Sequence, residues 1–186
     1  MADPARRSTS AGESWLGRFA GDVRGVAAIE FALIAPVLIV CYLGLSEFGQ
    51  AYMAQKRMIH TSSQVADMIA RAPETSRNEI EAVMDIGSLI MQPFPEAPLD
   101  LRVTSITRDN NGVARVDWSR GRGMAPLSGV QTVPDGLIAN GETIIMGEAA
   151  YDYDSPLDNF VPDGTRFSGR HYLRPRLTDQ IPCTDC

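Results

Sequence analysis

The chain is poor in lysine, histidine and cysteine, and these shortages exclude several kinds of function. Lys56 is its single lysine, only two histidines are present, and the 23 acidic residues outnumber the 17 basic ones to give a net charge of −6. Because binding to nucleic-acid phosphates requires clustered basic residues, this acidic balance argues against a nucleic-acid partner. The sequence contains no nucleophile elbow, phosphate-binding loop or metal-binding signature, so we expect no enzymatic activity and no cofactor.

The histidines and cysteines are also badly placed for catalysis or metal binding. His60 and His171 lie far apart in the sequence, and Cys41 lies in an apolar stretch, where cysteine commonly acts as a small apolar residue. Cys183 and Cys186 form a C-x-x-C pair, which is compatible with a disulfide if this part of the chain lies outside the cytoplasm. The pair follows a proline at the chain end, and only the two histidines could complete a zinc site, so a thioredoxin-like role and zinc binding are both disfavoured.

A long apolar stretch near the N-terminus is the dominant feature of the chain. It covers residues 26–45 and is interrupted only by Glu30, Pro36 and Gly44. As a helix, residues 26–46 would be about 31 Å long at about 1.5 Å per residue, which matches a hydrocarbon core of about 30 Å. We therefore predict one membrane-spanning helix, in which Pro36 should kink the helix or melt a turn because it lacks a backbone N–H.

Composition divides the chain into three predicted segments. Residues 1–25 are polar and carry four arginines and three acidic residues, a net charge of +1 that leaves −7 for the remainder. Such a polar leader is unlike a secretory signal peptide, whose apolar region begins early. We predict a leader over residues 1–25, a transmembrane helix with an outer amphipathic extension over residues 26–72, and an α+β domain over residues 73–186.

The outer extension of the helix carries a regular apolar stripe. Small or apolar residues recur at intervals of three and four: Ala51, Ala54, Met58, Thr61, Val65 and Met68. This spacing predicts one helical face that packs against a globular domain. Pro73 should end the helix near Ala72.

The remaining sequence predicts a short helix followed by a small sheet. Ser76 and Glu79 form a capping box, and prolines from Pro93 onward end that second helix. A short helical turn is expected at residues 135–139, and a loop at residues 121–129. Four segments have the alternation or composition of strands: residues 99–107, 113–118, 143–153 and 171–177. The last contains Pro175 and should be an edge strand. The fold class predicted is α+β, with an antiparallel sheet of about four strands packed on the outer half of the first helix.

A cluster of aspartates follows the third predicted strand. Asp152, Asp154 and Asp158 offer hard oxygen ligands at alternate positions and are candidates for binding calcium. No EF-hand pattern is present, and aspartate beside proline or glycine is common in ordinary turns. Turn formation is therefore the competing interpretation.

The N-terminal apolar stretch resembles a known family of pilus proteins. The run RGVAAIEF at residues 24–31, followed by Pro36 and then by Glu47 and Phe48, is similar to the TadE/TadG-like pseudopilins, or minor pilins, of tight adherence (Tad or Flp) pilus systems. The similarity extends to about residue 70. The chain has no D-x-S-x-S motif of the kind found in TadG proteins, so the resemblance is to TadE or TadF.

The resemblance implies a processing site and an assembly role. A prepilin peptidase would cut after Gly25, so that the mature chain begins at Val26, and Glu30, Phe31 and Pro36 would serve assembly. Glu30 would pair with the free amine of Val26 on its own or a neighbouring helix. The alternative is that Glu30 lies near the lipid headgroups and is merely tolerated there.

The resemblance also implies a location and partners. The protein would be a single-pass protein of the bacterial inner membrane, with its N-terminus in the cytoplasm, its C-terminal domain in the periplasm, and a route into the extracellular pilus. Its partners would be the prepilin peptidase, other pilins and pseudopilins, Tad assembly proteins and membrane lipid. The competing hypothesis is an uncleaved membrane adaptor that binds secretion-system components through its outer domain.

Overall fold

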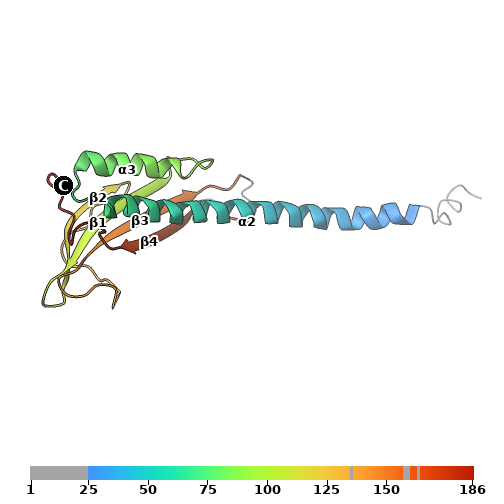
Figure 1. The fold of residues 1–186 in the computed structure, drawn as a ribbon. Coiled ribbons are helices and arrows are strands. Elements are labelled where there is room, and N and C mark those ends of the chain that lie inside the picture. The colour runs from blue at the N-terminus through green and yellow to red at the C-terminus, as the bar shows by residue number, and fades with distance from the viewer. Residues whose placement is uncertain (1–24, 135, 157–159, 163) are drawn as a thin grey trace, which may run out of the picture. The chain divides into compact units, whose positions relative to one another are not determined.

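The computed structural model describes residues 25–134, 136–156, 160–162 and 164–186 (Figure 1). Two helices, α2 (Val26–Ala70) and α3 (Arg77–Leu89), accompany one antiparallel sheet of four strands in the order β2-β1-β3-β4. The strands are β1 (Leu99–Arg108), β2 (Ala114–Arg122), β3 (Thr143–Tyr153) and β4 (Thr165–Leu173). The predicted α+β fold, with a long helix, a short helix and four strands, is confirmed.

The chain divides into two compact units, Met1–Leu43 and Gly44–Cys186. The outer part of α2 therefore belongs to the same unit as α3 and the sheet. In the first unit, every described residue of α2 except Ala35 and Leu43 is exposed, and its large apolar side chains include Ile29, Phe31 and Leu33. Helix α2 is long and apolar enough to cross a membrane, as its sequence predicts.

Helix α2 continues without interruption through Pro36. Of the two expected effects of Pro36, a kink or a melted turn, the melted turn is therefore wrong, and the kink stays a prediction. Proline removes one backbone hydrogen bond, but the rest of a long helix can hold the backbone on either side of it. The helix ends at Ala70, close to the predicted end, and the N–H of Ala72 donates to the carbonyl of Ile69 as the chain turns.

The predicted apolar stripe of α2 forms the centre of the main core. Ala51, Ala54, Met58, Thr61 and Val65 are all buried against the sheet. Met68, which was expected to continue the stripe, is only half-buried, and Ile69 is buried in its place. Alternating intervals of three and four average 3.5 residues, whereas a helix has about 3.6 residues per turn. Along this length the difference moves the buried face by one position, from Met68 to Ile69.

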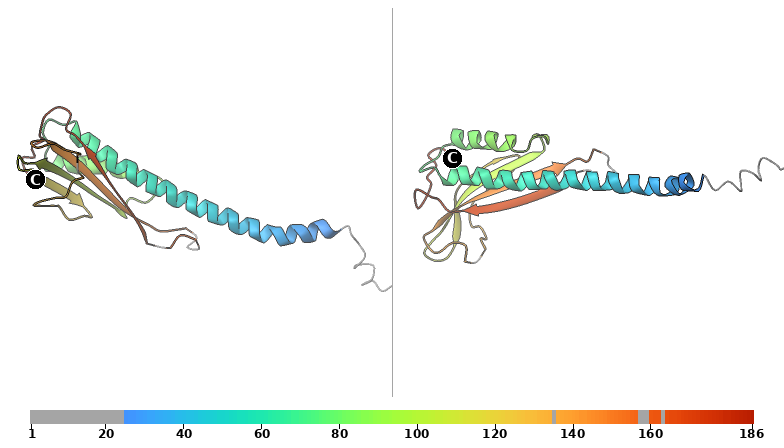
Figure 2. Two further views of the ribbon diagram at one scale, coloured as in Figure 1. Left: turned by 90° about the horizontal axis from the view of Figure 1, so that it is seen from below. Right: turned by 45° about the vertical axis from the view of Figure 1, so that its right-hand side comes forward.

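Two glycines permit direct contact between elements of the core. A Cβ atom on Gly147 of β3 would lie 2.5 Å from the Ser62 carbonyl oxygen and 2.7 Å from the Ala66 Cβ, so α2 packs directly on the strand backbone. A Cβ atom on Gly87 of α3 would lie 2.5 Å from a methyl carbon of Val65. Figure 2 shows α3 alongside the outer part of α2, where this contact holds the two helices together.

The opposite face of the sheet carries a second, smaller core. Its buried members are Ile106, Ala114, Val133, Ile138, Ile144 and Met146. Several come from the connection between β2 and β3, which thus covers part of this face. The position of Ile106 explains why it breaks the alternation of β1, because it faces this second core while Leu101 and Val103 face α2.

Three local predictions need correction. Strand β4 is Thr165–Leu173, not residues 171–177. It ends before Pro175. Its first residues alternate between half-buried and exposed, and few of them are apolar, so the sequence gives only a weak strand signal there. Strand β2 continues to Arg122, into the predicted loop. Residues 136–139 form a turn and bend rather than a helical turn, and Asp135 lies outside the described residues. The edge position of β4 is confirmed.

The predicted start of α3 is confirmed. The N–H of Glu79 donates to the Ser76 hydroxyl at 3.3 Å, and this hydroxyl donates to the Glu79 carboxylate at 3.1 Å. The capping box therefore satisfies one of the free N–H groups at the first turn of the helix.

The contact at Gly87 predicts a selective effect of alanine substitution. Gly87→Ala should lower the free energy of unfolding by about 1–3 kcal/mol, because the added methyl group overpacks the contact with Val65. Gly49→Ala is the matched control, since a Cβ at this exposed position of α2 meets nothing within 4 Å. Alanine should be neutral there or stabilising by up to about 1 kcal/mol, as in an ordinary helix. The measurement is chemical unfolding of the detergent-solubilised protein by circular dichroism. Equal stability of the two variants would contradict the close approach.

Candidate functional site

The residues of the predicted processing and assembly segment are presented on the surface. Gly25 directly precedes α2, Val26 is its first residue, and Glu30, Phe31 and Pro36 follow within the helix. All five are exposed. Arg24 and the rest of the leader lie outside the described residues.

Glu30 lies one helical turn beyond Val26. Residues four apart share a helix face, and side chains of a helix tilt toward its N-terminus. The Glu30 side chain is therefore directed back toward the turn that contains Val26. Among the described residues, no hydrogen bond or ion pair reaches its carboxylate, so the charge is available to a group outside this part of the chain.

A second carboxylate, Glu47, is buried in the second unit. Only 1% of this residue is exposed. It accepts hydrogen bonds from the backbone N–H groups of Phe160 (3.1 Å) and Val161 (3.3 Å) and from the Ser155 hydroxyl. The resemblance that includes Glu47 does not anticipate this burial. The carboxylate instead joins α2 to the connection between β3 and β4.

The surroundings of Glu47 are apolar. The Phe160 ring lies over Gly44, 3.5 Å from the position of a Cβ atom there. The Tyr153 ring is buried against Phe94 and Phe167, with centroid separations of 6.4 and 6.0 Å. Burial, together with the nearby Glu47 carboxylate, raises the pKa of Tyr153, so this phenol remains protonated at neutral pH.

One sequence signal could have located Glu47. Intervals of three and four lead back from Ala54 to Ala51, then to Glu47 and to Gly44, so the carboxylate continues the buried stripe of α2. A charged residue on a buried stripe requires hydrogen-bond partners. The sequence does not show which residues supply them, because Ser155, Phe160 and Val161 are more than 100 positions away.

Of the predicted calcium candidates, Asp152 is held in an ion pair. Both carboxylate oxygens of Asp152 accept from one guanidinium nitrogen of Arg166, at 2.8 and 2.6 Å, and Arg166 also pairs with Asp100. Hydrogen bonds to Asp100 and Asp152 raise the pKa of Arg166, so its positive charge is retained. Asp154 is exposed and Asp158 lies outside the described residues. Calcium binding at these residues stays a prediction.

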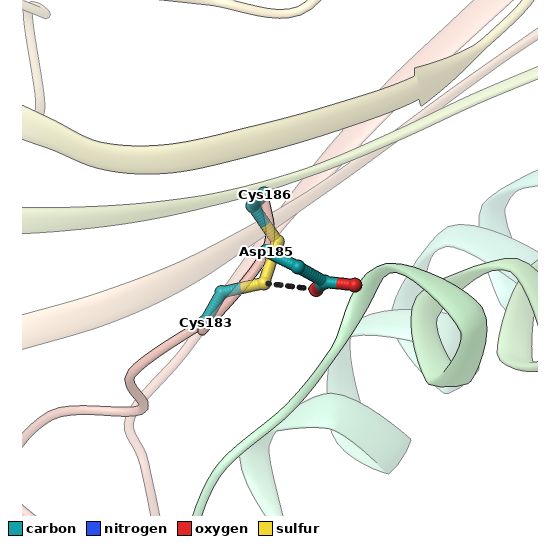
Figure 3. Close-up of side chains that lie close together, drawn as sticks. All are labelled: Cys183, Asp185 and Cys186. Carbon is teal, nitrogen blue, oxygen red and sulfur yellow. Dashed lines mark hydrogen bonds between the residues drawn. A yellow bond between two sulfur atoms is a disulfide. The ribbon is translucent and has the colours of Figure 1, made fainter.

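Cys183 and Cys186 are joined by a disulfide beside Asp185 (Figure 3). These three residues form the one group of potential metal ligands that the described part of the chain brings together. Because a metal requires the thiolate form of cysteine, the disulfide leaves no sulfur ligand available. Asp185 instead accepts from the Arg77 backbone N–H at 2.6 Å, at the first residue of α3. A carboxylate at this end of a helix is stabilised by the free N–H groups and the helix dipole.

The segment that carries this disulfide fastens several parts of the second unit. The Arg176 N–H donates to the carbonyl of Ala70 at the end of α2, at 2.8 Å. The indole N–H of Trp118 donates to the Ile181 carbonyl at 2.7 Å, and the Thr75 N–H donates to the Pro182 carbonyl at 3.0 Å. The last residues of the sequence thus hold the end of α2, the start of α3 and strand β2.

The histidines do not form a catalytic arrangement with the described residues. The Ser62 hydroxyl and His171 Nδ1 lie 2.9 Å apart, and Ser62 also donates to the Ile59 carbonyl. Within the described ranges, no carboxylate bonds to the His171 ring. His60 is exposed on α2. The Ser62–His171 contact joins α2 to β4.

The buried carboxylate of Glu47 predicts a graded loss of stability. Glu47→Ala should lower the free energy of unfolding by about 1–3 kcal/mol, because the buried N–H of Val161 loses its acceptor. Glu47→Gln should lose less, since the amide keeps one acceptor oxygen. The measurement is chemical unfolding together with amide hydrogen exchange at Phe160 and Val161. Glu74→Ala, at an exposed position, is the control, and a loss no larger than that of this control would refute the role of Glu47.

Comparison with known proteins identifies the N-terminal part of the chain. Residues 25–67 match the family model described as TadE-like protein. This confirms the predicted resemblance over that segment, which begins at Gly25 and includes both Glu30 and Glu47. No curated protein and no solved structure matches the chain.

Proposed function

We propose that the protein is a minor pseudopilin that assists the initiation or biogenesis of a Tad pilus. The observation that carries this proposal is the agreement between the TadE-like match and the physical character of α2. The match begins at Gly25, directly before an exposed apolar helix that places one carboxylate, Glu30, a turn after its first residue. The TadE-like segment supports association with a Tad pilus, and the remaining steps are our hypothesis.

The proposed processing step creates the partner of Glu30. Cleavage of the Gly25–Val26 peptide bond by a prepilin peptidase would leave a positively charged amine on Val26. The Glu30 side chain is directed toward that turn, so it can neutralise this amine in its own helix or in a neighbouring one. A charge in lipid is costly unless it is paired, which gives the subunits a reason to associate through this end of the helix.

The proposed location follows from the helix and the outer unit. Helix α2 would cross the inner membrane with its N-terminus in the cytoplasm, and the unit Gly44–Cys186 would lie in the periplasm. The Cys183–Cys186 disulfide is compatible with that oxidising compartment. The proposed partners are the peptidase, other pilins and pseudopilins, Tad assembly proteins and membrane lipid.

We also propose that the role is structural and not enzymatic. The buried polar groups of the second unit hold its elements together: Glu47 binds a loop, and Ser62 contacts His171 across α2 and β4. The competing hypothesis is an uncleaved membrane adaptor that uses the same outer unit to bind secretion-system components. The two hypotheses differ in whether the chain is cut.

Processing can be tested by intact mass and N-terminal sequencing of the protein from native membranes. We expect the chain to begin at Val26 when the prepilin peptidase of the cell is present and to keep its leader when the peptidase is deleted. A catalytically inactive peptidase is the control for indirect effects of the deletion. A full-length chain under both conditions would refute the pseudopilin proposal and favour the adaptor.

The assembly role of Glu30 predicts that loss of its carboxylate blocks assembly without blocking membrane insertion. Glu30→Gln should still insert into the membrane, because removing a charge makes insertion easier, but it should lose incorporation or pilus production. The measurements are membrane fractionation of the variant and quantification of sheared pili. Glu74→Gln is the control, since it removes a carboxylate from an exposed position of the outer unit. Normal piliation by Glu30→Gln would contradict the proposed pairing.

A further inference from the structure

An apolar groove of about 340 Å³ lies beside the Glu47 network, wholly within the unit Gly44–Cys186. One wall comes from α2 and the other from the connection between β3 and β4 and the start of β4. The principal lining residues are Phe48, Ala51, Tyr52, Phe160, Pro162 and Phe167. The processing and assembly roles proposed above do not use this groove.

The mouth of the groove is rich in exposed aromatic surface. Phe48 is 59% exposed, Tyr52 58% and Phe160 38%, and Leu45, one turn before Phe48, is 76% exposed. The ammonium group of Lys56 lies 5.3 Å from the centroid of the Tyr52 ring. Exposed apolar patches of this kind mark a surface that contacts another molecule or a membrane.

The groove residues of α2 follow the predicted membrane span directly in the sequence. Phe48 follows Leu45 by three residues, which is about 4.5 Å of helix rise. Beyond the apolar residues, the order along α2 is an aromatic ring at Tyr52 and then a cation at Lys56. Aromatic residues concentrate at the boundary between acyl chains and headgroups, and lysine extends its ammonium group into the headgroup layer. This order is the one expected where a helix leaves a bilayer.

Glu47 holds the second wall of the groove at the same level. Its carboxylate binds the backbone N–H groups of Phe160 and Val161, and the Phe160 ring lies over Gly44. The loop therefore presents Phe160 and Pro162 next to the part of α2 that follows the span. Because the buried carboxylate holds the backbone of Phe160 and Val161, docking requires little further ordering of these two residues.

We propose that this groove docks on the outer surface of the membrane that α2 crosses, with Phe48, Tyr52 and Phe160 at the boundary between headgroups and acyl chains. The proposal rests on the membrane-anchoring part of the proposed function and does not require cleavage after Gly25. It assigns Glu47 a positioning role, because the carboxylate holds Phe160 at the level of the bilayer surface. The membrane would thus contact the outer unit as well as the span.

The test is photocrosslinking with the full-length protein. p-Benzoylphenylalanine replaces Phe160, or in a second variant Tyr52, and the protein is reconstituted into vesicles of phosphatidylethanolamine and phosphatidylglycerol. The same probe at Leu33, an exposed residue of the apolar stretch, reports on the span itself. The probe at Leu177, which is also exposed but does not line the groove, is the matched control for random contact. Adducts are identified by mass spectrometry.

We expect the probes at Phe160, Tyr52 and Leu33 to gain the mass of one phospholipid, and the probe at Leu177 to gain none. Adding Glu47→Ala to the Phe160 variant should reduce its lipid adduct while leaving the Leu33 adduct unchanged. Lipid adducts at Leu33 but at neither Phe160 nor Tyr52 would overturn the docking proposal and leave the anchor intact. Absence of lipid adducts at Leu33 would overturn both. A covalent dimer from the Phe160 and Tyr52 probes, in place of a lipid adduct, would show that a second copy occupies the groove and would also overturn the proposal.

Discussion

The second unit depends on the direct contact between α2 and the backbone of strand β3. Gly147 leaves no side chain between them, so Ser62 and Ala66 of the helix lie against the strand itself. Interiors of proteins are packed at high density, and a helix so close to a sheet has few alternative positions. The stripe of small residues on α2 is therefore as important for the fold as its large apolar residues. Gly87 extends the same principle to α3, which contacts Val65 of the same helix.

Polar groups fix the two ends of this contact. Near Gly44, the Glu47 carboxylate binds the connection between β3 and β4. Near Ala70, the Arg176 N–H binds the end of the helix, and Asp185 binds the first turn of α3. Both sets of hydrogen bonds join segments that are distant in the sequence. The part of α2 from Gly44 to Ala70 is thus held by apolar packing along its length and by hydrogen bonds near each of its ends.

Much of the fold could be predicted from the sequence because its strongest signals are local. Residue spacing predicts the stripe of α2, and Ser76 with Glu79 predicts the start of α3. Strand β3 is also evident, since Thr143–Tyr153 is rich in Ile and Tyr, and it is buried on both faces. Strand β4 was misplaced because an edge strand with one half-exposed face has weak alternation, and Pro175 was taken as part of it. The partners of Glu47 and Asp185 could not be predicted, since each lies about 100 positions away and only the tertiary structure brings it near.

The C-terminal segment also determines when the outer unit can finish folding. Residues 176–185 supply a bond to the end of α2, an acceptor for Trp118 and the acceptor at the first residue of α3. A ribosome adds these residues after both helices and all four strands have been synthesised. The start of α3 and the end of α2 therefore wait for them, and the unit reaches its final structure only after synthesis has passed residue 185.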